Sequence, residues 1–96
     1  MNSRSVFCQL RESLENYVTN DLNIKIPTEF LAIDNDTAIM FLRMKVKPIY
    51  NNPNEQDQVA AHIRAAEQLY PDISNKIDET QRAKLFKYLE AMLELV

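Results

Sequence analysis

Apolar residues recur at every third or fourth position in three stretches of the chain, with charged and polar residues between them. This spacing places the apolar side chains on one side of a helix, where they can pack against a core. In the first stretch, for example, Phe7, Leu10 and Leu14 share one face, while Arg11 and Glu12 lie between them. The pattern predicts helices over residues 5–22, 53–70 and 78–95.

The second and third predicted helices are preceded by residues that commonly begin helices. Asn52 and Pro53 offer a capping side chain and a proline at the first helical position. Asp78 and Gln81 have the spacing of a capping box, in which each side chain bonds to the backbone of the other residue. We expect Pro71 to end the second helix, because proline cannot continue the backbone hydrogen bonding.

Between the first two predicted helices the pattern changes to an alternation of apolar and basic residues. The apolar positions are Met40, Leu42, Met44 and Val46. Alternation with a period of two is typical of a strand with one buried face. The Asn and Asp residues at 34–36 tolerate the backbone of a tight turn. We therefore predict two strands, over residues 28–33 and 37–47, that form a hairpin across this turn.

These elements predict an α+β fold in the order α-β-β-α-α, with three helices packed on a short antiparallel hairpin. The length of 96 residues predicts a single domain, residues 1–96. Both faces of the predicted hairpin carry apolar side chains, and three helices can cover only one face fully. An uncovered apolar ribbon favours association with another chain.

The sequence therefore predicts a small protein-interaction module without enzymatic activity, such as an adaptor, an inhibitor or immunity protein, or a subunit of a complex. Its partner is either a second copy, in a homodimer, or a different protein. The predicted interface is the uncovered face of the hairpin or the broad apolar stripe of the last helix. Its candidate residues are Phe30, Ile39, Phe41, Phe86 and Leu93.

A row of basic residues on the second predicted strand gives an alternative function. Arg43, Lys45 and Lys47 point to one side of that strand, and Tyr50 follows them. Such a surface can contact phosphates and stack a base, as in a nucleic-acid-associated regulator, or it can contact an acidic protein partner. Lysine on an edge strand also prevents aggregation between sheets, which needs no ligand. The net charge of −3 argues against strong binding to nucleic acid.

Composition argues against most catalytic and cofactor sites. The chain contains no glycine, which phosphate-binding loops, dinucleotide fingerprints and nucleophile elbows require. Cys8 and His62 are the only residues of their types, so we predict no metal site, no cofactor and no catalytic residues. Cys8 would act as a nucleophile only with His62 as its base, and its helical position predicts a buried thiol instead. Without a signal-peptide pattern or a membrane-spanning run, we expect a cytoplasmic protein that does not enter a membrane.

Overall fold

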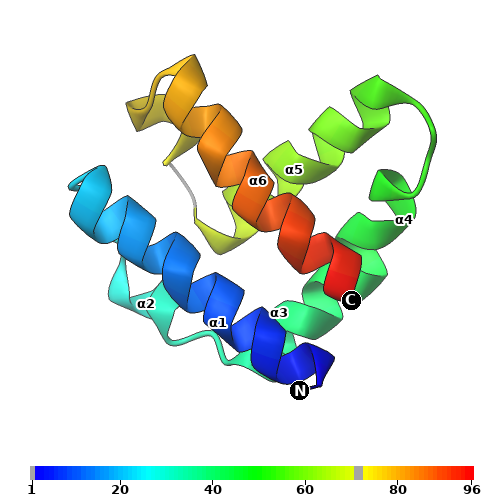
Figure 1. Ribbon diagram of the computed structural model, residues 1–96, viewed down its shortest axis with the longest axis horizontal. Helices are drawn as coiled ribbons and strands as arrows, with labels where there is room; N and C mark the ends of the chain where they lie inside the picture. Colours follow the sequence, from blue (N-terminus) through cyan, green and yellow to red (C-terminus); the bar gives the residue numbers. More distant parts are fainter. Residues whose placement is uncertain (1, 71–72) are drawn as a thin grey trace.

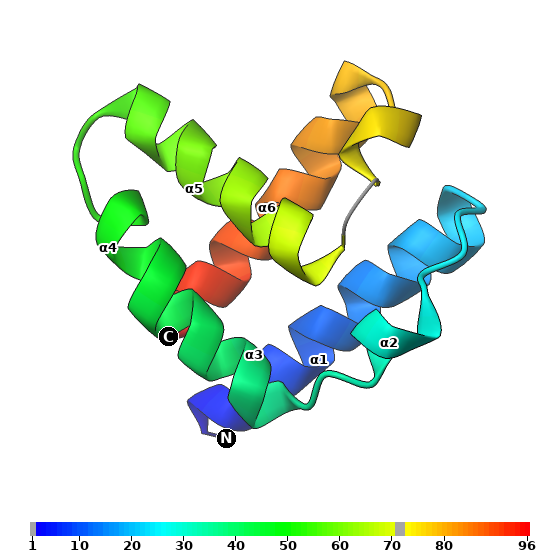
Figure 2. The same ribbon diagram turned by 180° about the vertical axis from the view of Figure 1, so that it is seen from behind.

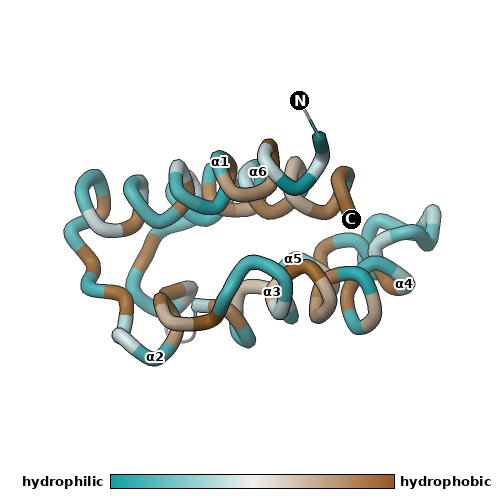
Figure 3. Tube along the Cα trace, turned by 90° about the horizontal axis from the view of Figure 1, so that it is seen from below, coloured by the Kyte–Doolittle hydropathy of each residue, from teal (hydrophilic) through white to brown (hydrophobic). Residues whose placement is uncertain are grey.

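The computed structural model describes residues 2–70 and 73–96 and shows two layers of helices (Figure 1, Figure 3). In one layer, α1 (Ser3–Asn16) lies antiparallel beside α6 (Glu79–Leu95). The other layer consists of α2 (Thr28–Leu31), α3 (Asn35–Phe41), η2 (Leu42–Val46), α4 (Lys47–Tyr50) and α5 (Glu55–Leu69). Two short segments complete the fold: the π-helical turn η1 (Tyr17–Asp21), which extends α1, and the 3-10 turn η3 (Ser74–Lys76) before α6.

The segments α3, η2 and α4 form one continuous helical rod over residues 35–50 (Figure 2). Its middle turn, η2, is π-helical and therefore wider than an α-helical turn. Pro48 lies two residues after this turn, and a proline ring normally clashes with the carbonyl group four residues earlier. The wide turn relieves this clash, so the rod continues past Pro48. After a loop over residues 51–54, α5 runs back along the rod and packs against α4 and η2.

The structure contains no strand in residues 2–70 and 73–96, so the predicted α+β fold with its antiparallel hairpin is wrong. The residues expected to form the tight turn instead begin a helix. Asp34 is the N-cap of α3, because its Oδ1 atom accepts the backbone N–H of Thr37 at 2.7 Å. Asp and Asn favour both turns and helix caps, and here the cap is formed.

The apolar spacing of the same segment explains why a helix replaces the second predicted strand. Ala38, Leu42 and Val46 lie four residues apart, and all three side chains are completely buried. They form the buried face of the rod, while Met40 and Met44 lie on an exposed face. A spacing of four residues satisfies both a period of two and a helical period, so the sequence pattern does not separate the two structures.

The first and third predicted helices are confirmed with small shifts at their ends. Asn2 caps α1 by accepting the backbone N–H of Ser5 at 2.8 Å. The capping box of α6 is formed as predicted. The Gln81 backbone N–H donates to Asp78 Oδ1 at 2.8 Å, and the Asp78 backbone N–H donates to Gln81 Oε1 at 3.0 Å.

The second predicted helix is also present, but it begins two residues later than expected. Asn54 caps α5 by accepting the backbone N–H of Gln56 at 2.7 Å, so Asn52 and Pro53 belong to the preceding loop. Pro71, which we expect to end this helix, lies outside the described residues.

A chain without glycine must reverse direction with other residues, and Asn23 does so after η1. Its φ angle of 56° lies in the left-handed region, which asparagine tolerates better than most residues. The reversal brings the Ile24 N–H to within 3.0 Å of the Val18 carbonyl oxygen, which closes the helix end. The chain can then cross to α2 in the second layer.

The core lies between the two layers. α6 contributes Leu85, Leu89, Met92 and Leu93, all completely buried. Phe7 and Leu14 of α1 and the buried face of the rod pack against the same cluster. The start of α1 and the end of α6 lie beside α3, and their side chains leave a groove at that corner of the molecule.

Candidate functional site

An apolar groove of about 340 Å³ opens where the start of α1, the side of α3 and the end of α6 meet. Phe7 of α1 and Ile39 of α3 line it, together with Leu95 and Val96 at the end of α6. Met40 is the fifth apolar residue of the lining, and the remaining lining residues are polar or charged. Concave apolar surfaces of this kind accept side chains of a ligand or partner.

Two methionines extend the apolar surface beyond the groove. Met40 and Met44 are four residues apart on the rod, so they lie on the same side of it. Their side chains are 49% and 62% exposed, which makes Met44 the most exposed large apolar residue in the described part of the chain. Methionine is flexible and polarisable, so it adapts to the shape of a bound partner.

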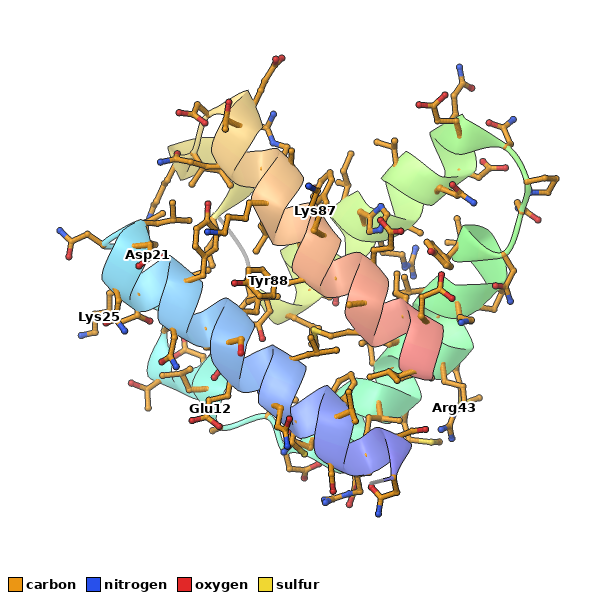
Figure 4. All side chains as sticks on the ribbon, viewed as in Figure 1. Glu12, Asp21, Lys25, Arg43, Lys87 and Tyr88 are labelled. Carbon is orange, nitrogen blue, oxygen red and sulfur yellow. The ribbon has the colours of Figure 1, made fainter. Side chains whose placement is uncertain are left out.

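Two cations on the same segment have no partner within the described residues. Arg43 lines the groove, and Lys45 lies two residues further along η2. Both are exposed, and neither side chain forms an ion pair or a hydrogen bond in residues 2–70 and 73–96. Figure 4 shows Arg43 projecting outward beside the C-terminal end of α6. The other arginine of the groove, Arg4, is already paired with Asp36 at 2.9 Å. We call Met40, Arg43, Met44 and the groove the docking face.

The predicted row of basic residues is divided between two environments. Arg43 and Lys45 are exposed, whereas Lys47 and Tyr50 turn toward the end of α6. The Lys47 ammonium donates to the Leu93 carbonyl oxygen and lies 5.7 Å from the centre of the Tyr50 ring.

Tyr50 is tied to the same end of α6 by its hydroxyl group. This hydroxyl donates to Glu94 Oε1 at 2.6 Å. The hydrogen bond to the carboxylate, together with burial, raises the pKa of Tyr50 to about 12. Lys47 and Tyr50 therefore join α4 to α6, and they do not form a surface with Arg43 and Lys45.

The five predicted interface residues are found in different places. Ile39 lines the groove. Phe30, Phe41 and Phe86 are half-buried against the core and keep part of their surface exposed. Leu93 is completely buried. Because the hairpin does not exist, Phe30 and Phe41 do not face each other across a ribbon, and only Ile39 of the five belongs to the docking face.

A second depression, of about 440 Å³, is polar and lies between α1 and the connection from α2 to α3. Arg11 is almost completely buried there. Its Nε atom donates to Glu15 Oε1 at 3.0 Å, and its Nη1 atom donates to Asn35 Oδ1 at 3.1 Å. The neighbouring carboxylate already neutralises the guanidinium, so we assign Arg11 the role of joining α1 to α3.

Cys8 lines this polar depression and is half-buried. His62, the other residue considered for nucleophilic chemistry, lies in α5 and contacts Tyr50 and Phe86 instead. The structure does not bring Cys8 and His62 together. No group of three or more His, Cys, Asp or Glu side chains suited to a metal ion occurs among the residues that the structure describes.

Sequence reasoning missed the two exposed methionines, which it assigns to the core face of a strand. The signal was present in the spacing. Ala38, Leu42 and Val46 form one series with a spacing of four, and Met40 and Met44 form a second series offset by two residues. In a helix, an offset of two residues places the second series on a different face.

Comparison with known proteins finds no matching family model, no matching curated protein and no matching solved structure. In the described part of the chain, no helix combines the length and the apolar character needed to cross a membrane.

Proposed function

We propose that this chain is a cytoplasmic, non-enzymatic protein-interaction module whose docking face binds an amphipathic, acidic segment of a different protein. The proposal is carried by one observation: beside an apolar groove, the two most exposed methionines lie next to cations that have no partner in the described part of the chain. Apolar side chains of the partner would enter the groove and contact Met40 and Met44. A carboxylate of the partner would meet Arg43.

The local positive charge of the rod beside the groove supports an acidic partner. The chain as a whole carries −3, yet the segment from Met40 to Lys47 contains three basic residues and no acidic one. Arg43 and Lys45 therefore give this side a local charge opposite to that of the whole molecule. Complementary charge contributes mainly to the association rate and to the choice of partner, while the buried apolar contacts supply affinity.

The local backbone supports the same surface. Arg43, Met44 and Lys45 all lie on η2, the π-helical turn of the rod. Turns of this type are rare, and within helices they occur often at functional sites. The wide turn changes the direction in which these three side chains leave the helix, compared with a regular α-helix.

The same charges argue against a homodimer built on this face. In a dimer with two-fold symmetry the same patch meets itself, so the cations of one copy approach those of the other. Like charges facing each other destabilise an interface. The nucleic-acid alternative loses its support, because the basic strand is absent and Lys47 and Tyr50 are bound to α6.

A selection of random peptides displayed on phage tests the proposal directly. We expect peptides selected on the folded chain to carry apolar residues at helical spacing and at least one Asp or Glu. Arg43→Glu places a negative charge opposite the acidic residue of the peptide, so attraction becomes repulsion. This variant should weaken peptide binding about tenfold. Met44→Asp removes a central apolar contact and should weaken it about thirtyfold.

Matched controls lie on α5. Arg64→Glu reverses an exposed charge that has no partner among residues 2–70 and 73–96. Ile63→Asp introduces an acid at an apolar side chain that is 40% exposed. Both controls should leave peptide binding unchanged. The proposal is overturned if no peptide is selected, if the selected peptides lack acidic residues, or if the controls weaken binding as much as the docking-face variants. A dimer in sedimentation that Met44→Asp dissociates would overturn the choice of a different protein as partner.

A further inference from the structure

His62 lies where α4, α5 and α6 meet. The residue is only 8% exposed, although histidine is polar. Its ring stacks on Phe86 of α6, with ring centres 5.2 Å apart and an angle of 17° between the planes. Tyr50 of α4 meets it edge-on, at 5.6 Å and 74°. Tyr50, His62 and Phe86, from three helices, therefore form one aromatic cluster.

One ring nitrogen of this histidine has no partner. The Nε2 atom is buried and forms no hydrogen bond within the described residues, while the ring bonds to the backbone of Gln58 one turn earlier. In the neutral tautomer whose Nδ1–H donates to this backbone, Nε2 carries only a lone pair. Protonation would place a buried N–H group there without an acceptor, which is unfavourable in an apolar environment.

The charged groups around the ring act in opposite directions. From α6, Glu90 attracts a proton to His62. From α4, Tyr50 contacts the His62 ring in a T-shaped arrangement, and its hydroxyl donates to Glu94. The Lys47 ammonium lies 5.7 Å from the centre of the same Tyr50 ring. The helix of His62 itself contributes the backbone of Gln58. Burial outweighs Glu90, so the pKa of His62 lies below its ordinary value of 6.5.

The aromatic cluster is also connected to the last turn of α6. Tyr50 donates to Glu94, and its neighbour Lys47 donates to the Leu93 carbonyl oxygen. Leu95 and Val96 follow directly and line the groove of the docking face. Any movement of Tyr50 therefore changes how the end of α6 is fixed.

We propose that His62 makes this aromatic cluster sensitive to acid. When the His62 ring takes up a proton, it leaves its place beside Tyr50 and Phe86, and the last turn of α6 is released from α4. The release is a property of the fold alone. Its consequence, loss of one wall of the groove and weaker peptide binding at acid pH, rests on the proposed function. Folded chains bind fewer protons at His62 than unfolded chains do. The contribution of His62 to the free energy of unfolding is therefore fully present above pH 6.5. It is lost as the pH falls from there through the pKa of His62 in the folded chain.

Because His62 is the only histidine, its ring protons give a single, assigned set of NMR signals on the free chain. We expect these signals to titrate below pH 6.5, and the backbone amides of residues 93–96 to shift with the same midpoint. His62→Phe keeps an aromatic ring but cannot titrate, so those amides should no longer shift between about pH 7 and pH 5.

Glu90→Gln is the second variant, and it leaves the ring in place. Removing the carboxylate that attracts the proton should move the titration of His62 to lower pH, and the amides of residues 93–96 should follow. The proposal is overturned if the ring titrates at or above 6.5, if these amides do not share its midpoint, or if they still shift in His62→Phe. No peptide enters this experiment, so it can fail or succeed independently of the peptide selection.

Discussion

At the scale of single residues, one carboxylate begins the helix in the middle of the chain. Asp34 precedes two further residues, Asn35 and Asp36, that also occur in tight turns. Its Oδ1 atom accepts the Thr37 N–H, and this bond satisfies one of the free N–H groups at the start of α3. The hydrogen bonds from Thr37 also hold the pKa of Asp34 below its ordinary value.

We expect Asp34→Ala to lower the midpoint of thermal unfolding by roughly 5 °C near neutral pH, because α3 loses its cap. The pKa of Asp34 is lower in the folded chain than its ordinary value of 3.8, so the contribution of Asp34 to stability is present above pH 3.8. This contribution disappears as the pH falls through the pKa of Asp34 in the folded chain. The difference in unfolding midpoint between Asp34→Ala and the wild type, measured by circular dichroism, should therefore become smaller in acid.

Asp36→Ala serves as the control for this prediction, because the one side-chain contact of Asp36 that the described residues show is an exposed ion pair with Arg4. Exposed pairs contribute little to stability, so this variant should unfold close to the wild-type temperature. Equal effects of the two variants would contradict the role of Asp34 as the cap of α3.

At the scale of elements, the rod over residues 35–50 distinguishes this fold from the predicted hairpin. Lys45 lies in its middle and is exposed, so its side chain makes no contact that the rod needs. The residue is thus a suitable place to test the backbone alone. Proline in the interior of a helix removes a backbone hydrogen bond and clashes with the preceding turn.

We expect Lys45→Pro to lower the free energy of unfolding by about 3 kcal/mol in urea titrations. Lys45→Ala, which keeps the backbone N–H, should change it by less than about 0.5 kcal/mol. A hairpin with this residue on an open edge would tolerate the proline much better. Similar stabilities for the two variants would argue against the rod.

At the scale of the whole molecule, polar contacts between sequence-distant helices supplement the shared core. The Tyr70 hydroxyl, just after α5, donates to Glu15 Oε1 of α1 at 3.3 Å. Lys84 of α6 lies 4.6 Å from the centre of the Tyr17 ring. Tyr88 of α6, labelled in Figure 4, packs against the same ring. These contacts hold α1 to α6 within one layer and to α5 across the layers.

Alkaline unfolding tests the contact across the layers. Burial and the nearby Glu15 raise the pKa of Tyr70 above its ordinary value of 10.0, so the folded chain keeps this proton longer than the unfolded chain. Stability from Tyr70 is therefore complete below pH 10 and is lost as the pH rises above it. We expect Tyr70→Phe to unfold at higher pH than the wild type, as measured by circular dichroism.

Tyr88→Phe is the matched control, because its ring contact with Tyr17 does not require the hydroxyl group. Its alkaline unfolding should follow that of the wild type. An unchanged unfolding pH in Tyr70→Phe would show that Tyr70 does not limit stability in alkali.

The three longer helices follow from the sequence alone, and so does the way in which the last of them begins. Each has an apolar stripe with a helical period, and Asp78 with Gln81 forms a cap that depends only on residues within one turn. The absence of glycine also limited the reversals of the chain to residues such as Asn23. These features are local, so no knowledge of distant neighbours was needed.

The structure of the segment from Asp34 to Tyr50, and with it the docking face, depends on contacts with distant parts of the chain. Its buried residues repeat every four positions, which both a strand and a helix can accommodate, and its first residues suit both a turn and a cap. The choice between these structures depends on what covers the apolar face. In the folded chain α5 and α6 pack against this segment, which buries Leu42 and Val46 and leaves Met40 and Met44 exposed.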